Sequence, residues 1–575
     1  MKIEDIIRAL PSDAADSLLS VMDVALGLMG KASLWPEHVP HRASNPVSSR
    51  HLLETAAGML LEMAPEDRLR TISDILDSSS AWLQSELWIR KGANNQLVGM
   101  IDENESVRFS FAPALRPCIT YAFQASRGAR QPKIQFCSLQ EYAHKLIRTI
   151  AIILDLEDAI DFEQTLPWDY RSRERFDLEF AFPPFGSAIS EYDEHSNQII
   201  YALGIDQSRR GRLSHETVAI ANALASTNGR SIICVTDGEL FRMVGAEPVV
   251  RRTLVESGRL TDVLAIPPSL MFSSTLIKTN LVVIGSKGTN SDQVRFIDLG
   301  NQELAQRGAR GRMDVRSDAD WNEQVKASAI QKPGQARNVD RGEIAASNFI
   351  LTPERYLNTG PRDRISAFLA KSEVALLAEV VEMVRPINLA SNEIGKYIVR
   401  EAAPSDVDLQ RGYIREPNRV LQVDPATYNK AFSQQLRPGD LVLSIKGTIG
   451  IVGIVPDHVP QEAERTIWTA GQSLMILRPK KRGGMSRVVL YEYLTNDTVQ
   501  SFLRSLAAGS TIMNLAMKDL KDFPVPILDA ESTQAIEASF AAREAVFNHI
   551  AELDQQIKVM RAQSWPHNQL GPEET

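Results

Sequence analysis

The chain has 575 residues, of which 43% are hydrophobic and 23% are charged, and its formal net charge is −9. This length exceeds what one hydrophobic core can hold and predicts three or four folded units, at roughly 100–200 residues each. The composition excludes a disordered chain, and the acidic balance excludes a wholly basic nucleic-acid binder, although a local basic face remains compatible with it.

No apolar run reaches the ~20 residues that a membrane span needs. The amino terminus carries Glu4 and Asp5 where a secretory signal would carry basic residues. We therefore expect a cytoplasmic protein without a membrane partner. Cys118, Cys137 and Cys234 lie in apolar contexts without metal-ligand spacing, so we interpret them as reduced core residues and predict no metal site.

Residues 1–95 show apolar positions at helical spacing, from Ile3 to about Gly30 and again from Ser49 to about Glu86. We predict a helical amino-terminal domain there.

The stretch from Phe176 to Gly186 reads Phe-Asp-Leu-Glu-Phe-Ala-Phe-Pro-Pro-Phe-Gly. Its apolar first half is typical of a buried strand, and the two prolines end that strand because neither can donate a ladder hydrogen bond. In open α/β sheets, ligands bind at the carboxyl ends of strands, so a stiff turn with an aromatic ring suits stacking on a base. A rigid turn with no further role is the alternative.

This stretch resembles the catalytic loop of the DNA adenine-N6 methyltransferases, in particular the modification subunits of type I restriction-modification systems, which have Asn-Pro-Pro-Phe-Gly. The resemblance implies that Phe182, Pro183, Pro184 and Phe185 form the catalytic loop. Phe182 replaces the asparagine that accepts hydrogen bonds from the target amine. A phenyl ring accepts none, and a buried unpaired amine costs about 1–3 kcal/mol, so the substitution argues against catalysis.

That family holds S-adenosylmethionine on a glycine-rich turn after the first strand, because only glycine lets the backbone come so close. The best match is a strand from Val107 to Phe111, followed by Ala-Pro-Ala-Leu-Arg-Pro-Cys from Ala112 to Cys118, where the family has Asp-Pro-x-Cys-Gly-Ser-Gly. A second register, from Ile75 to Ala81, also lacks glycine.

Two further cofactor positions are changed. Ser138 stands where the family places a carboxylate toward the ribose, and Gln164 where it places an acid toward the adenine amine. The resemblance thus implies degenerate cofactor positions at Ala112, Pro113, Ser138 and Gln164. We predict no bound cofactor, or S-adenosylmethionine if other residues rebuild the pocket.

Helices and strands then alternate as in this family as far as Ile284, and Thr275–Asn280 resembles its terminal antiparallel hairpin. We predict a degenerate methyltransferase-like domain over residues 96–300. Apolar density falls over residues 301–347, which we interpret as a linker. Its basic cluster, Arg-Gly-Ala-Arg-Gly-Arg from Arg307 to Arg312, is either a solvated arm or an arm that grips phosphates.

Residues 348–530 resemble the target-recognition domain of type I specificity subunits. Leu436 to Gly450 contains a Pro-Gly-Asp turn, a buried strand and a polar loop with glycines, and Tyr491 to Pro526 contains a helix, a Gly-Ser-Thr turn and a Val-Pro ending. The resemblance implies DNA contacts, with a solvated surface charge as the alternative at each lysine. The candidates are Lys446, Thr448, Arg478, Lys480, Arg504 and Lys518.

We predict a long helix over residues 531–565, because apolar residues recur there in a near-heptad stripe. The stripe consists of Ile536, Phe540, Phe547, Ile550, Leu553, Ile557 and Met560. Such a face needs a partner helix, either from a second chain in a homodimer or from its own domain.

The predicted fold class is α/β: a helical domain, a Rossmann-like sheet of the class I methyltransferase type, an α+β target-recognition domain and a long carboxyl-terminal helix. The predicted function is that of a DNA-binding subunit in a restriction-modification or phage-defence complex, bound to double-stranded DNA and to other subunits, with a pseudo-methyltransferase scaffold. One alternative is an active site-specific adenine-N6 methyltransferase, so whether the chain is an enzyme stays open. The other is a protein-interaction module.

Overall fold

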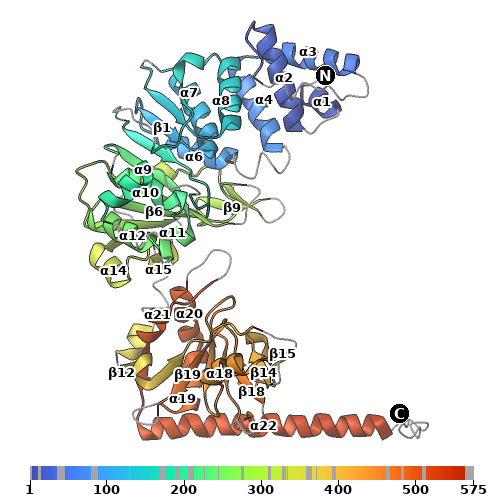
Figure 1. Cartoon of the computed structure of the whole chain (residues 1–575), viewed down its shortest axis with the longest axis vertical. Coiled ribbons are helices and arrows are strands. Elements are labelled where there is room, and N and C mark those ends of the chain that lie inside the picture. Colours follow the sequence, from blue (N-terminus) through green and yellow to red (C-terminus); the bar gives the residue numbers. More distant parts are fainter. Residues whose placement is uncertain are drawn as a thin grey trace. The chain divides into compact units, whose positions relative to one another are not determined.

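The computed structural model divides the chain into two compact units, residues 1–357 and residues 358–575 (Figure 1). The described residues are 3–10, 14–34, 46–78, 88–128, 130–168, 176–189, 194–204, 213–225, 227–243, 245–272, 277–308, 312–326, 332, 334–357, 365–370, 372–390, 397–460, 466–480, 485–507 and 513–563.

In the described part of the first unit, nine strands form one mixed sheet in the order β11-β8-β6-β7-β5-β4-β1-β2-β3. Strands β1 to β5 run parallel, and β7 lies antiparallel between β5 and β6. The strands are β1 (Val107–Ser110), β2 (Ile134–Cys137), β3 (Asp161–Glu163), β4 (Leu178–Ala181), β5 (Arg230–Thr236), β6 (Leu260–Ile266), β7 (Thr279–Ile284), β8 (Gln293–Asp298) and β11 (Ala336–Asp340).

Strand β7 is buried along its whole length, because it lies in the middle of the sheet with helices over both faces, and its Leu-Val-Val-Ile run suits that position. Of the predicted hairpin segment Thr275–Asn280, residues 275 and 276 lie outside the described residues, and its last two residues begin the antiparallel strand β7. The predicted α/β class with a methyltransferase-type sheet is confirmed.

The helices of this unit are α1 (Ile3–Ala9), α2 (Ala14–Leu28), α3 (Pro46–Glu62), α4 (Pro65–Ser78), α6 (Lys91–Gly99), α7 (Leu115–Ala125), α8 (Glu141–Ile153), α9 (Glu194–Ala202), α10 (His215–Ala225), α11 (Asp237–Phe241), α12 (Glu247–Glu256), α13 (Trp321–Lys326), α14 (Arg341–Ala346) and α15 (Pro353–Leu357). The predicted amino-terminal helices are present, and they share one hydrophobic core with the sheet. Arg68 on α4, for example, donates from Nη1 to the carbonyl oxygen of Ile153 at the end of α8, 2.9 Å away. The second predicted cofactor register lies partly in α4, and its residues 79–81 are outside the described residues.

The interpretation of residues 301–347 as a linker is wrong for the residues that the structure describes. This stretch contains a hairpin of β9 (Ala305–Arg307) and β10 (Met313–Val315), and its strand β11 pairs with β8. Val339 in β11 and Trp321 in α13 are fully buried. The next domain also begins later than predicted, because Tyr356 stacks on Phe296 of β8 with ring centroids 4.3 Å apart.

The second unit has mixed α+β structure, with four-, three- and two-stranded sheets among its described residues. Strand β16 is buried throughout, as the sequence predicted. The elements are β12 (Glu373–Leu376), α17 (Leu377–Val380), β13 (Val381–Val384), β14 (Tyr397–Ala402), β15 (Arg419–Val423), α18 (Pro425–Ser433), β16 (Leu441–Ser444), β17 (Val452–Ile454), β18 (Thr466–Ala470), β19 (Leu474–Pro479), α19 (Arg487–Thr495), α20 (Asp497–Leu506), α21 (Met517–Lys521), β20 (Pro524–Ile527) and α22 (Ala530–Gln563). The predicted Gly-Ser-Thr turn at residues 509–511 lies outside the described residues.

Helix α22 packs against its own unit in its first half and is exposed in its second half (Figure 1). Phe540 is buried, with its ring centroid 6.1 Å from that of Tyr413 and 5.8 Å from that of Tyr491. Beyond Phe547 the predicted stripe is exposed, and its members are Ile550, Leu553, Ile557 and Met560. Packing on its own domain therefore accounts for three residues of the predicted stripe, Ile536, Phe540 and Phe547.

Among the described residues, no helix combines the length and apolarity that crossing a membrane requires, and no cluster of three metal-ligating side chains occurs. All three cysteines are buried and none forms a disulfide, as the sequence predicted.

Candidate functional site

The order of the strands reverses between β1 and β4, because the chain passes from β1 to β2 and β3 and then returns to β4 on the other side of β1. Ligands of open α/β sheets bind in the crevice outside the carboxyl ends of the strands at such a switch point. Ser110 at the end of β1 pairs with Ala181 at the end of β4. Phe111 and Phe182 are therefore the first residues beyond the sheet, and we define the candidate site around them.

Phe111 has an unusual backbone conformation, with φ 72° and ψ 159°. This region is almost restricted to glycine and costs a larger residue on the order of 1–3 kcal/mol. Its amide donates to the carbonyl oxygen of Cys137 at the end of β2, 2.8 Å away. The surrounding structure thus holds Phe111 in a strained position next to the crevice.

The side chain of Phe111 begins a row of aromatic rings. Phe111 and Trp168 are each 5% exposed, and their ring centroids are 5.8 Å apart. The ring of Trp168 lies 5.9 Å from that of His215, whose Nδ1 is 3.1 Å from the carbonyl oxygen of Ser187. Sequence reasoning missed Trp168 and His215, because nothing in their local pattern connects them to Phe111. Aromatic side chains therefore fill this part of the carboxyl edge.

The turn after β1 is closed by an ion pair rather than opened by glycines. Arg116, which the sequence comparison aligns with the first glycine of that turn, is 3% exposed. Its guanidinium donates to both carboxylate oxygens of Asp77, at 2.6 Å and 3.0 Å, and to the carbonyl oxygen of Ile89, at 2.6 Å. It also lies 4.6 Å from the ring centroid of Trp88. Cys118, at the second glycine position, is fully buried. Both positions therefore carry side chains, whereas the cofactor-binding turn of the family has glycine at each of them.

The other predicted cofactor positions lie together on consecutive strand ends. Ala112 and Pro113 follow β1, Ser138 follows β2 and Gln164 follows β3, and these strands are neighbours in the sheet. Ser138 is buried, its carbonyl oxygen lies 2.7 Å from Nε2 of His144, and Gln164 is exposed. None of these four residues carries a carboxylate, so they do not offer the acceptors that a ribose diol and an adenine amine prefer.

Phe182, at the predicted catalytic position, belongs to the hydrophobic core. It is 1% exposed and its ring lies parallel to that of Phe180, with centroids 6.3 Å apart. Phe180 in turn stacks on Phe109 of β1 at 6.0 Å. The phenyl ring therefore extends a row of core aromatics and offers nothing to a substrate.

The rest of the predicted loop is held in a fixed geometry. Pro183 is buried and Pro184 is exposed, while Phe185 packs edge-on against Phe272, with ring centroids 5.7 Å apart. The amide of Gly186 donates to Oε2 of Glu216, 2.9 Å away.

Glu216 lies in the first turn of α10 and is almost fully buried. Its Oε1 accepts hydrogen bonds from the amide of Thr236 at 2.6 Å and from the hydroxyl of Thr236 at 2.9 Å. It therefore ties the Pro-Pro-Phe-Gly loop to the end of β5. The sequence did not single it out, because an acid in the first turn of a helix is common wherever it stabilises the helix dipole.

A second carboxyl group is buried beside Glu216. Glu239 on α11 accepts hydrogen bonds from the hydroxyl of Thr217, at 2.9 Å to both of its oxygens, and from that of Ser214, at 3.2 Å. Burial, and after it the negative charge of Glu216, raises the pKa of Glu239 to about 8. The group is therefore largely protonated at neutral pH.

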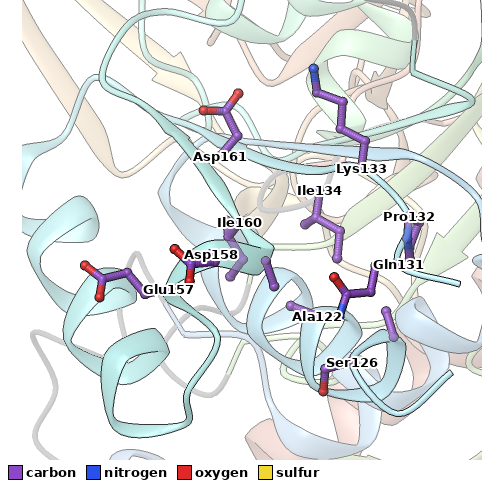
Figure 2. Close-up of a pocket in the computed structure, with 12 residues that line it drawn as sticks. Ala122, Ser126, Gln131, Pro132, Lys133, Ile134, Glu157, Asp158, Ile160 and Asp161 are labelled. Atoms are coloured by element: carbon purple, nitrogen blue, oxygen red, sulfur yellow. The ribbon is translucent and has the colours of Figure 1, made fainter. Parts of the chain in front are cut away.

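The opposite, amino edge of the sheet carries a cleft of about 370 Å³ (Figure 2). It lies at the starts of β2 and β3, and Gln131, Lys133, Glu157, Asp158 and Asp161 are among the residues that line it. Ligands of such sheets bind at the other edge, so we do not assign this cleft to the candidate site.

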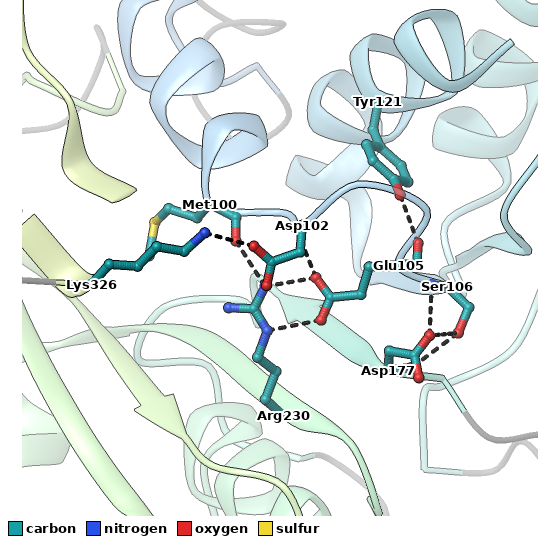
Figure 3. A network of polar contacts seen from close by, with 8 residues as sticks. All are labelled: Met100, Asp102, Glu105, Ser106, Tyr121, Asp177, Arg230 and Lys326. Carbon is teal, nitrogen blue, oxygen red and sulfur yellow. Dashed lines mark hydrogen bonds and ion pairs between the residues drawn. The ribbon is translucent and has the colours of Figure 1, made fainter. Parts of the chain in front are cut away.

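Ion pairs cross the same amino edge (Figure 3). Arg230 at the start of β5 lies 2.6 Å from Glu105, and Lys326 lies 2.7 Å from Asp102. Burial lowers the pKa of Arg230, but the hydrogen bond and the charge of Glu105 outweigh it and raise that pKa overall. The hydroxyl of Ser106 donates to Asp177 just before β4, 2.6 Å away.

In the second unit, the loop after β16 carries Lys446 and Thr448. The amide of Gly447 donates to the carbonyl oxygen of Met513 at 2.9 Å, and the hydroxyl of Ser444 donates to the carbonyl oxygen of Thr448 at 2.5 Å. Lys446 is half-buried and Thr448 is exposed. The loop is thus fixed at both ends, with Thr448 toward solvent.

Arg478 has a structural role that differs from the predicted DNA contact. Its guanidinium donates to both carboxylate oxygens of Asp440, each at 2.9 Å, and to the carbonyl oxygen of Gln435 at 3.0 Å. Asp440 is the acid of the Pro-Gly-Asp turn and is buried. This ion pair holds the turn against β19 and leaves Arg478 little freedom to reach a phosphate.

The remaining predicted contacts are exposed on separate elements. Lys480 follows β19 and donates to the carbonyl oxygen of Ala378 at 2.8 Å. Arg504 on α20 donates to Gln500 at 3.1 Å, and Lys518 lies in α21. Their assignment to DNA stays a prediction.

The strand order with β7 between β5 and β6, and the Pro-Pro-Phe-Gly loop at the end of β4, define a domain of the class I methyltransferase type. Residues 129–364 match the family described as N-6 DNA Methylase. This part of the chain is therefore similar to N-6 DNA methylases, including a type I methylase subunit.

Among curated proteins, the methylase subunit of the type I restriction enzyme MpnII from Mycoplasma pneumoniae is 29% identical over 131 residues, which is 23% of each chain. The match thus spans about a quarter of that subunit's length.

Two solved structures show low overall similarity. The type I methyltransferase subunit from Streptococcus thermophilus is 16% identical with a TM-score of 0.46, covering 60% of this chain and 77% of that one. The type IIG restriction endonuclease BpuSI is 11% identical with a TM-score of 0.45, covering 94% of this chain and 71% of that one.

Proposed function

We propose that this chain is a DNA-binding subunit of a restriction-modification or phage-defence complex, and that its methyltransferase-like domain serves as a scaffold. The observation that carries this proposal is that aromatic side chains fill the crevice at the switch point between β1 and β4. Phe111 and Trp168 pack together where a class I sheet binds its ligand, and Phe182 belongs to the core.

We also propose that the chain does not bind S-adenosylmethionine. The groups that would hold it are replaced together: Arg116 and Cys118 stand for the two glycines, and Ser138 for the ribose carboxylate. The guanidinium of Arg116 is itself buried, so moving it aside would break its ion pair with the partly buried Asp77 and its hydrogen bond to Ile89.

The second unit would supply DNA recognition, through the fixed loop with Lys446 and Thr448 and the exposed Lys480, Arg504 and Lys518. The exposed half of α22 would hold another subunit or a second copy of the chain, because a heptad stripe of this kind is stable when a partner helix covers it.

An active adenine-N6 methyltransferase is the second candidate. It is favoured by the family match over residues 129–364 and by the hydrogen bond from Gly186 to Glu216, which holds the Pro-Pro-Phe-Gly loop at the site. The two candidates differ in ligand binding and in catalysis.

Isothermal titration with S-adenosylmethionine tests the choice. The scaffold proposal expects no heat of binding, and it expects Phe182→Asn alone to give no methylated adenine because the cofactor turn is missing too. Micromolar binding by the unmodified chain, or methylation of DNA by it, would establish the enzyme instead.

A mobility shift across a salt series tests DNA binding itself. Binding that relies on phosphates must weaken steeply as salt rises. The absence of any shift at low salt would favour a protein-interaction module.

A further inference from the structure

The β9–β10 hairpin belongs to the first unit, where Figure 1 labels β9, and its described residues include two arginines, Arg307 and Arg312. Arg307 ends β9 and pairs with Met313 of β10, and the amide of Gly308 donates to the carbonyl oxygen of Arg312 at 2.7 Å. Both arginine side chains are exposed. Neither has an acidic partner among the residues that the structure describes.

The base of the hairpin is firmly anchored. Asp314 of β10 forms an ion pair with Arg90, and Arg90 also donates to the carbonyl oxygens of Ser269 and Met313, at 2.7 Å and 2.6 Å. The carboxylate of Asp314 occupies the place where a Cβ on Gly308 would stand, so glycine is needed there for this ion pair. The backbone at the two arginines is therefore fixed relative to the rest of the first unit, which distinguishes the hairpin from a solvated arm.

A cleft of about 400 Å³ lies at this base, and Arg312 is among its lining residues. The other charged groups there compensate one another. Asp77 is bound by Arg116, Asp314 by Arg90, and Lys91 lies 3.1 Å from Asp74. Arg312 adds an uncompensated positive charge, so this region favours an anion.

The hairpin stands at the carboxyl edge of the sheet. The amide of Met313 donates to the hydroxyl of Ser269, 3.2 Å away, in the loop that follows β6. The same loop carries Phe272, which contacts Phe185 of the Pro-Pro-Phe-Gly loop. An anion bound by the hairpin would therefore lie along the edge that contains the candidate site.

We propose that Arg307 and Arg312 bind backbone phosphates of double-stranded DNA lying along this edge. The inference rests on the proposed DNA-binding function and adds a contact in the first unit, outside the target-recognition-like unit. Two exposed guanidinium groups on neighbouring strand positions can each neutralise one phosphate. Such contacts position a protein on the duplex without reading its sequence.

The test compares three double variants of the full chain by DNA affinity over a salt series. R307A/R312A removes two unpaired cations. R50A/R70A is the control, because it removes the same charge from exposed arginines that pair with Glu54 and Asp67 on their own helices. R307K/R312K keeps the charge.

Each lost phosphate contact lowers the slope of log K against log salt by about 0.9, so R307A/R312A should lower it by about 1.8 and weaken binding equally on unrelated sequences. The control and the lysine variant should retain the slope of the unmodified chain. All variants should unfold at the same denaturant midpoint, since the changes are on the surface.

An unaltered slope in R307A/R312A, with DNA binding by the unmodified chain intact, would overturn the inference and leave the proposed function standing. An equal loss in R50A/R70A would also overturn it, because the effect would then reflect net charge. Failure of the unmodified chain to bind DNA at low salt would instead reject the proposed function.

Discussion

The two edges of the nine-stranded sheet are built in opposite ways. At the amino edge, hydrophilic side chains such as Arg230 and Lys326 form ion pairs that remain partly open to solvent. At the carboxyl edge, Phe111, Trp168 and Phe182 are buried. The edge at which this kind of sheet binds ligands is thus closed by buried side chains, both these aromatic rings and the polar groups of Arg116 and Glu216. The difference indicates that this edge now contributes to folding stability, a role that substitutions can measure.

The largest effect is expected for Phe182→Ala. Removal of a fully buried phenyl ring should lower the free energy of unfolding by about 3–5 kcal/mol. Urea unfolding of the full chain measures it, and Phe182→Leu, which keeps most of the volume, should cost less. A loss below about 1 kcal/mol for the alanine variant would mean that the ring faces an open site rather than the core.

The next effect concerns Arg116, the buried cation in the turn after β1. Arg116→Ala removes the bidentate ion pair with Asp77, while the hydrogen bond from Trp88 to Asp77 stays, and should cost about 1–3 kcal/mol, the penalty for a polar group that loses a partner. The double variant with Asp77→Asn should be less damaging than the sum of the two single changes, because no charge is then left behind. If the losses of the two single variants add up to the loss of the double variant, the ion pair does not stabilise the turn.

A comparison of two substitutions at Phe111 isolates the strain at the switch point. Both Phe111→Ala and Phe111→Gly remove the ring, but only glycine adopts φ 72° and ψ 159° freely. The glycine variant should therefore be the more stable of the two by about 1–2 kcal/mol. Equal stabilities would show that the backbone is not held in this conformation in solution.

The raised pKa of Glu239 predicts that the stability of the folded chain depends on pH. Its pKa is about 8 in the folded chain, raised by burial, and returns to the ordinary value of 4.5 on unfolding. Between these values the folded state binds the extra proton, so stability should fall as pH rises, by at most about 1.4 kcal/mol per pH unit, and should level off above pH 8. Glu239→Gln cannot titrate and should lose this part of the pH dependence. Identical pH profiles for the two proteins would contradict the raised pKa.

The sequence allowed much of the fold to be predicted, because buried strands such as β4 and β16 are apolar runs ended by proline or glycine. It failed for β11, whose Arg337 and Asn338 resemble a loop although Val339 beside them is fully buried in the edge strand. At the candidate site, sequence reasoning found the altered positions but not what fills the crevice. Trp168 and Asp77 are distant in sequence from Phe111 and Arg116, so only the folded chain brings these side chains together.

The smallest effect is expected at the amino edge, for Lys326→Ala. Lys326 and Asp102 form a 2.7 Å ion pair, but their side chains are 60% and 55% exposed. Water already screens this exposed pair and solvates the Asp102 carboxylate that remains after the substitution, so the loss should be below about 0.5 kcal/mol and should diminish further at high salt. If Lys326→Ala lowered the free energy of unfolding as much as Phe182→Ala, the two edges would not differ in this respect. The polar amino edge would then stabilise the sheet as much as the aromatic carboxyl edge. A small, salt-sensitive loss would instead leave the buried aromatic packing at the carboxyl edge as the larger contribution to the stability of the sheet.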